Sequence, residues 1–166
     1  MKTNIFYTIY TNLHTNTAYS SLATQITKIF PITLNTFIIP TIYGRFIFND
    51  GIPFMYSNVI GGEGYNPHYE QQIPFSGLTH TESTLKLLGN AQIQVRHKFH
   101  EKQYLTLSGN YAIHQNQFSN FLQGKKIYGT SIGYGYDSPL GPIEGFICYS
   151  NRTNKLGFYL NIGFGF

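Results

Sequence analysis

The C-terminal stretch of the chain, GFYLNIGFGF, alternates between two kinds of residue with a period of two. One row carries large apolar side chains: Phe158, Leu160, Ile162, Phe164 and Phe166. The other row consists of Tyr159, Asn161, Gly163 and Gly165. Since successive side chains of a strand point to opposite faces of a sheet, this alternation predicts a strand with one apolar face.

The alternation returns in the segments 89–100, 103–114 and 125–137; the second rows of the last two are rich in Gly, Ser, Thr and Asn, and that of 89–100 carries Gln92, Gln94, Arg96 and Lys98. Charged residues make up only 11% of the chain against a usual ~25%, so these second rows are not the charged outer face of a soluble sandwich. Small polar residues on one face and aromatic or aliphatic residues on the other are typical of a barrel wall in lipid. The sequence therefore predicts an all-β fold, an antiparallel transmembrane β-barrel.

The remaining predicted strands are less regular. They lie at about 4–13, 18–30, 34–48 and 141–150. The third contains Pro40, which has no backbone N–H to donate to a neighbouring strand. In the last, Phe146 faces the opposite side of the strand from Ile143 and Ile147. The count is eight strands: three, then a long loop near 49–88, then five. If the last strand ends on the periplasmic side, short turns gather on that side and long loops on the other, as in bacterial outer-membrane barrels.

Other features narrow the alternatives. No run of about eighteen apolar residues exists, which excludes a membrane-spanning helix. Lys125 and Lys126 form the only basic pair, too little for a nucleic-acid surface, and the single Cys148 excludes an internal disulfide. The start, MKTNIFYTIYTNLHT, lacks the apolar segment of a secretory signal, so if the protein lies in an outer membrane we expect the chain to be a fragment or the back end of a longer precursor.

The last ~45 residues, including YGYDSPLGPIEGFICYSNRTNKLGFYLNIGFGF, resemble the final strands of the BamA-like surface-antigen superfamily of outer-membrane barrels. Within it they are most similar to the barrels that follow a patatin-like phospholipase domain, as in PlpD-type lipases and their Bacteroidetes relatives. The resemblance implies a sixteen-stranded barrel, of which residues 1–166 would be the C-terminal half. It also implies a Gram-negative outer membrane as the location.

The long loop carries NVIGGEGYNPHYEQQIPFSGL, similar to the loop that folds into the barrel lumen in that superfamily. The matching positions are Gly61, Gly62, Ser76, Gly77 and Leu78. The family usually has Arg where this chain has Ser76, which argues against an arginine-mediated lumen contact and an insertase role. The resemblance further makes Leu160, Ile162, Phe164 and Phe166 an assembly signal read by the barrel-assembly machinery.

Three motifs invite a chemical interpretation and do not sustain it. GTSIG around Ser131 spells the nucleophile elbow, but it lies mid-strand and no histidine follows it, so a small lumen residue is the better interpretation. VIGGEGY lacks the Lys-Ser/Thr pair of a phosphate loop. The six histidines lack the ligand spacing of a metal site. We expect no catalytic residue, cofactor or metal in this chain.

The leading hypothesis is an integral outer-membrane barrel that anchors, and exports or displays, an N-terminal patatin-like phospholipase domain. Its expected partners are outer-membrane lipid, the assembly machinery and the upstream remainder of the barrel; a homodimer stays open. The alternative is a complete eight-stranded small barrel, either structural or a lipid A-modifying enzyme.

Overall fold

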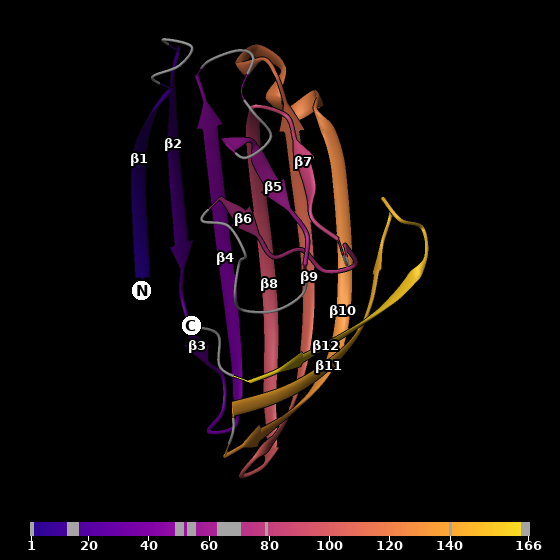
Figure 1. Ribbon diagram of the computed structural model, residues 1–166. Coiled ribbons are helices and arrows are strands. Elements are labelled where there is room, and N and C mark those ends of the chain that lie inside the picture. Colours follow the sequence, from indigo (N-terminus) through magenta and orange to yellow (C-terminus); the bar gives the residue numbers. More distant parts are fainter. Residues whose placement is uncertain are drawn as a thin grey trace.

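The computed structural model describes residues 2–12, 17–48, 52, 56–62, 71–78, 80–139 and 141–163 (Figure 1). These residues form one long antiparallel sheet, a small three-stranded sheet and a single short helix. The long sheet contains β1 (Lys2–Asn12), β2 (Thr17–Thr27), β3 (Phe30–Pro31), β4 (Thr36–Ile47), β8 (Leu87–His100), β9 (Gln103–Gln115), β10 (Lys125–Ser138), β11 (Gly141–Ser150) and β12 (Leu156–Ile162). The small sheet contains β5 (Asn58–Ile60), β6 (Gln72–Ile73) and β7 (Glu82–Thr84), and the 3₁₀ helix η2 spans Phe118–Gln123.

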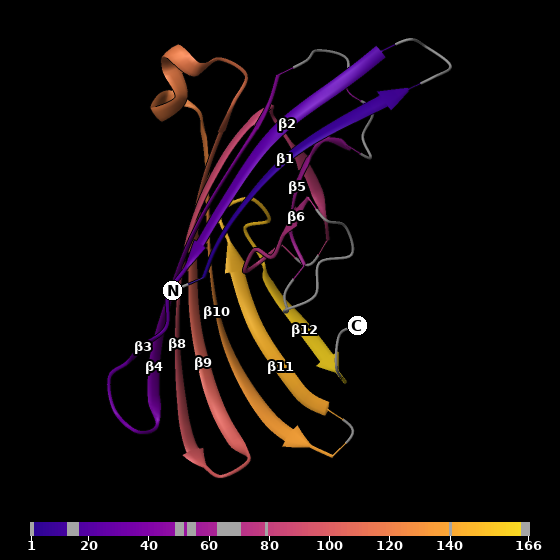
Figure 2. The same ribbon diagram turned by 90° about the vertical axis from the view of Figure 1, so that its left-hand side faces the viewer.

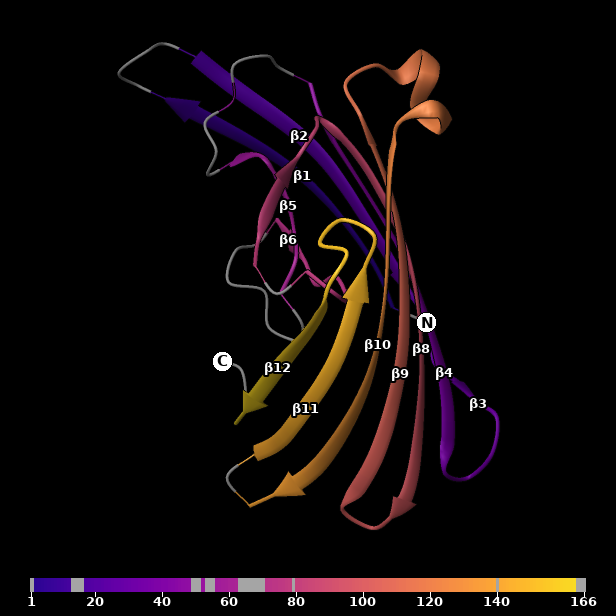
Figure 3. The same cartoon turned by 90° about the vertical axis from the view of Figure 1, so that its right-hand side faces the viewer.

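The long sheet follows the chain in the order β1-β2-β4-β8-β9-β10-β11-β12, each strand antiparallel to the next. Figures 2 and 3 show that the sheet is strongly curved and has a concave and a convex face. The prediction of an all-β antiparallel fold is confirmed. Closure into a barrel is not found: β1 and β12 form the two edges of the described sheet and do not pair with each other.

Pro40 explains why the second predicted strand, about 18–30, is divided into β2 and β3. The backbone N–H of Lys28 donates to the carbonyl of Pro40 at 3.2 Å, but Pro40 has no N–H to return the bond. The strand is therefore interrupted at residues 28–29. After the interruption β3 pairs with β4 in the same register as β2 does, with Phe30 opposite Ile38. The proline is accommodated at an interruption of the ladder, as expected for proline in a sheet.

The two faces of the sheet differ in the way that the alternation predicts. Along β10, side chains alternate between exposed and buried from Lys126 to Gly135. One register row on the convex face runs across five neighbouring strands and is apolar throughout: Val95, Leu107, Ile132, Ile147 and Phe158. The last four of these are 50–67% exposed. In a chain with so few charges, such an exposed apolar face calls for a nonaqueous neighbour.

The concave face is covered by the segment between β4 and β8. Its small sheet, β6-β5-β7, lies on the inner side of the curved wall (Figures 2 and 3). A buried apolar cluster joins the two, with Ile60, Ile73, Phe75 and Leu78 from the segment and Leu88, Ala112 and Ile127 from the long sheet. Strands β5, β6 and β7 were not predicted from the sequence, which treated this segment only as a loop.

Glycines on β10 leave room on the concave face for large rings from neighbouring strands. A β-carbon at Gly133 would lie 2.2 Å from the ring of Phe146, and one at Gly135 would lie 2.2 Å from the ring of Tyr104. The inward Phe146 that made 141–150 look irregular therefore packs over a glycine of the adjacent strand. Within the described residues, no helix is long and apolar enough to cross a membrane.

Candidate functional site: the loop docked on the concave face

Gly61 and Gly62 follow directly after β5 in the docked segment. Both have positive φ angles, 119° and 76°, which residues with a side chain rarely adopt. A β-carbon at Gly61 would lie only 2.2 Å from the carbonyl oxygen of His80. The Gly62 N–H donates to the Leu78 carbonyl at 2.6 Å, so the double glycine is bonded to the far side of the segment.

The tip of the segment is a tight turn whose Leu78 N–H donates to the Phe75 carbonyl at 3.2 Å. Between them lie Ser76, 2% exposed, and Gly77, with a φ of 83°. A β-carbon at Gly77 would lie 2.3 Å from the backbone of Tyr149 on β11. The wall contributes a glycine of its own to this contact. A β-carbon at Gly129 of β10, the strand next to β11, would lie 1.9 Å from the Ser76 carbonyl oxygen. Backbone therefore meets backbone at this contact, and glycine is required on both sides.

The Ser76 hydroxyl is held in a cluster of neutral polar side chains on β9 and β10. It lies 2.8 Å from the Ser108 hydroxyl and 3.2 Å from the Ser131 hydroxyl, and donates to Asn110 Oδ1 at 3.3 Å. The Asn110 amide in turn donates to the Pro74 carbonyl at 3.2 Å. None of these partners is charged, which suits a serine at this position.

Ser131 belongs to the same cluster of polar side chains. Its hydroxyl is 7% exposed and bonds to Ser108 and Ser76, and its backbone is part of β10 rather than of a strand-to-helix turn. A nucleophile elbow requires that turn. Ser131 is a small polar residue of the concave face.

The base of the segment is anchored by Arg45 of β4, which is only 3% exposed. Its guanidinium donates to Asn58 Oδ1 at 3.3 Å, to Ser21 Oγ at 3.2 Å and to the carbonyl oxygens of Tyr56 and Ser57 at 3.3 and 3.2 Å. Four hydrogen bonds from one planar group tie the start of the segment to β2 and β4. Arg45 was not predicted from the sequence, where its signal is a single charge inside the apolar run IYGRFIF.

Residues at the edge of the segment bind the β11–β12 turn. Arg152 forms a 3.0 Å ion pair with Glu82 of β7, and the Thr153 hydroxyl donates to the Gly77 carbonyl at 3.4 Å. The ion pair is largely exposed and contributes little, about 0–1 kcal/mol. Positioning therefore rests mainly on the buried contacts of the tip and of Arg45.

A second polar network on the concave face, centred on Glu144 of β11, was also missed. Its carboxylate is 1% exposed and accepts from Tyr104 Oη at 2.8 Å, Arg96 Nη2 at 3.4 Å and Asn161 Nδ2 at 3.4 Å. Arg96 also lies 4.4 Å from the centre of the Tyr104 ring and donates to Thr106 Oγ1. The network links β8, β9, β11 and β12, so it fastens the last strand to the wall.

The structure brings the five predicted loop residues together at the double glycine and the tip. Of the predicted assembly-signal residues, Leu160 and Ile162 are 53% and 67% exposed on the convex row of β12, and Phe164 and Phe166 lie outside the described residues. Among the residues that the structure describes, no group of three or more potential ligands could hold a metal ion.

The geometry defines a class of protein: a curved antiparallel wall with an exposed apolar convex face and a polar concave face on which a loop is docked. Comparison with family models then identifies the family. The model of the OMP85 superfamily matches residues 1–166, and the chain belongs to that superfamily, whose members are outer-membrane proteins. Comparison with curated proteins finds no significant match, and comparison with solved structures finds none either.

Proposed function

We propose that this chain is the C-terminal half of a sixteen-stranded outer-membrane barrel that anchors, and exports or displays, an N-terminal patatin-like phospholipase domain. OMP85 domains are generally transport or assembly proteins rather than enzymes, which agrees with a scaffold role for this segment. The two open sheet edges support an incomplete wall, because unpaired strand edges cannot face lipid. The upstream half would supply partners for β1 and β12.

The observation that carries the proposal is the five-strand apolar row exposed on the convex face, opposite a concave face of buried polar and apolar side chains. Tyrosines border this apolar band: Tyr111 and Tyr128 are register partners toward one end, and Tyr134 and Tyr136 lie toward the other. Tyr128 and Tyr136 are eight residues apart, about 26 Å along a strand and about 20 Å across the membrane at a strand tilt of ~40°, somewhat less than the apolar band of about 25 Å that aromatic girdles flank in a transmembrane barrel.

The membrane-facing assignment is tested by lysine substitutions on the two faces of the full-length protein. Leu107→Lys and Ile132→Lys place a charge in the middle of the convex band and should each cost ~2–4 kcal/mol. The matched control is Gln94→Lys: Gln94 is the register partner of Ser108 and shares its concave face, yet is only half-buried. The readout is outer-membrane fractionation with heat-modifiable gel mobility. Equal tolerance of all three lysines would refute the lipid-facing assignment.

The half-barrel assignment has its own test. Residues 1–166 expressed alone should lack an SDS-resistant, heat-modifiable form, whereas the full-length protein should have one. The eight-strand path of the long sheet keeps one alternative in view, a complete small barrel. A heat-modifiable form of residues 1–166 alone would favour that alternative. The patatin-like partner is tested by the reading frame upstream of Met1, which should encode that domain and further strands.

A further inference from the structure

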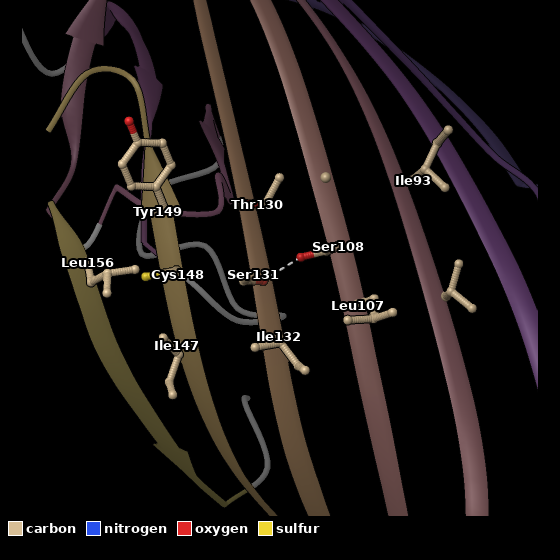
Figure 4. Close-up of a pocket in the computed structure, with 12 residues that line it drawn as sticks. Ile93, Leu107, Ser108, Thr130, Ser131, Ile132, Ile147, Cys148, Tyr149 and Leu156 are labelled. Atoms are coloured by element: carbon tan, nitrogen blue, oxygen red, sulfur yellow. Dashed lines mark hydrogen bonds between the residues drawn. The ribbon is translucent and has the colours of Figure 1, made fainter. Parts of the chain in front are cut away.

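The convex face contains an apolar groove of about 540 Å³ that crosses β8 to β12 (Figure 4). Its walls come from two adjacent register rows. The fuller row is the apolar row described above, from Val95 to Phe158; its first four members line the groove. The second row consists of Ile93, Gly109, Thr130, Tyr149 and Leu156. In Figure 4 the side chains of Ile132 and Ile147 line this face, while Ser108 and Ser131 bond to each other behind it.

The groove exists because the second row has a gap in its middle. Gly109 has no side chain, and a β-carbon built there would meet no heavy atom within 4 Å. Its register partner Thr130 is small, so the floor stays open between two walls of larger residues. The side chains of Leu107 and Ile132 at its border are 52% and 50% exposed.

Positive charge lies to one side of the groove, beyond its middle strand β10 and beside its β12 end. Along the convex face of β10, Thr130 is followed by Tyr128, 51% exposed, and then by Lys126, also exposed. Lys126 lies about 13 Å along the strand from Thr130. Lys155 directly precedes Leu156, which lines the groove. In the described part of the chain neither lysine takes part in an ion pair.

We propose that this groove holds one acyl chain of an anionic phospholipid whose phosphate contacts Lys126 and Lys155. The inference rests on the proposed function, since it places the convex face in lipid. Along β10 the apolar groove, the exposed Tyr128 and then Lys126 follow one another, which matches the amphipathic order of such a lipid: hydrocarbon, interface, anionic phosphate. A protein partner would need a far larger contact surface than the lining of this groove, since stable protein–protein interfaces bury about 1,200–2,000 Å².

The test is native mass spectrometry of the full-length protein, extracted in detergent and supplied with phosphatidylglycerol or with phosphatidylcholine of the same chains. We expect one retained phosphatidylglycerol per chain and weaker retention of phosphatidylcholine. Filling the groove with Gly109→Leu should reduce retention at least about tenfold, a loss of about 1.4 kcal/mol. Thr130→Phe fills it from the neighbouring strand and should do the same. Lys126→Gln should abolish the preference for the anionic lipid.

The matched control is Ala91→Leu, which adds nearly the same bulk, three carbons instead of four, to an exposed convex position one register row away, opposite Tyr111. It should retain lipid like the wild type. Undiminished retention in Gly109→Leu, or equal retention of the two lipids, would overturn the proposal. A change in oligomeric mass with unchanged lipid retention would also overturn it and identify the groove as a contact between copies. A protein that inserts normally but retains no lipid would leave the proposed function standing, whereas failure of the lysine tests would remove both.

Discussion

The phenol of Tyr104 on β9 donates a 2.8 Å hydrogen bond to the buried carboxylate of Glu144 on β11, although β10 lies between them. The ring reaches across because residue 135 of the intervening strand is glycine. The position of one side chain thus depends on the absence of another on the neighbouring strand. The same arrangement recurs where Phe146 lies over Gly133.

Gly135→Val should therefore displace the Tyr104 ring and destabilise the protein. Overpacking of this kind costs about 1–3 kcal/mol, to which the loss of the hydrogen bond to Glu144 adds. The measurement is the free energy of unfolding of the full-length protein in detergent. The matched control is Gly109→Val on the adjacent strand, where a β-carbon meets open space. Equal effects of the two substitutions would show that Gly135 does not make room for the ring.

Arg96 should matter far more than its neighbour on the same face, Lys98. Arg96→Gln leaves the Glu144 carboxylate, 1% exposed, without its cation and should cost about 3 kcal/mol, the low end for a buried pair because the Arg96 side chain is 22% exposed. Lys98→Gln breaks a 3.9 Å pair with Asp137 in which both side chains are nearly half exposed, and should cost about 0–1 kcal/mol. Urea unfolding of the two variants and the wild type measures both losses. If the two variants lost the same stability, the Glu144 network would not be a stabilising element.

Gly77→Ala should loosen the docked segment from the wall. The added methyl would lie 2.3 Å from the Tyr149 backbone, and the positive φ adds about 1–2 kcal/mol of strain. Limited proteolysis of residues 71–78 is the measurement, and we expect faster cleavage than in the wild type. The control is Gly145→Ala, since the nearest atom to a β-carbon there is 3.9 Å away. Unchanged cleavage in Gly77→Ala would mean that the tip tolerates displacement.

Period-two patterns could be read from the sequence because they depend only on neighbours along one strand. They placed the apolar rows of β8, β9, β10 and β12 on a common face, and the structure has them there. Strands β5, β6 and β7 have only two or three residues each, too few to show any period. The break at residues 28–29 depends on Pro40 of another strand, so only the pairing register reveals it.

The candidate site divides in the same way. The double glycine and the tip at Ser76–Leu78 were visible as local sequence features of the loop. The partners of Glu144 were not, because Arg96 and Tyr104 lie 48 and 40 positions away and meet it only through the register of four strands. A usable signal was nevertheless present. Glu144 is the sole charge in the strand GPIEGFICYS, and a charge in such a strand is expected to face inward and be paired.

Ser76→Arg would restore the residue that the resemblance leads one to expect at the tip, and it should destabilise this protein. The hydroxyl of Ser76 is 2% exposed and bonds to two serines and an asparagine, so an arginine there would be buried without an anion at a cost of several kcal/mol. Ser76→Ala, the control, should cost about 1 kcal/mol for the lost hydrogen bonds.

The double variant Ser76→Arg/Ser131→Asp distinguishes two reasons why an arginine at position 76 would destabilise the protein: the lack of an anion beside it and the lack of room for its side chain. Ser131 Oγ lies 3.2 Å from Ser76 Oγ, so an aspartate there would put a carboxylate beside the new guanidinium. Ser131→Asp alone should also be destabilising, and the pair should recover at least about 1 kcal/mol of coupling, within the range of about 0.5–3 kcal/mol for contacting residues. The double-mutant cycle is measured by unfolding in detergent. Purely additive losses would show that the tip excludes arginine by its size, because the loop backbone already lies against β10 and β11.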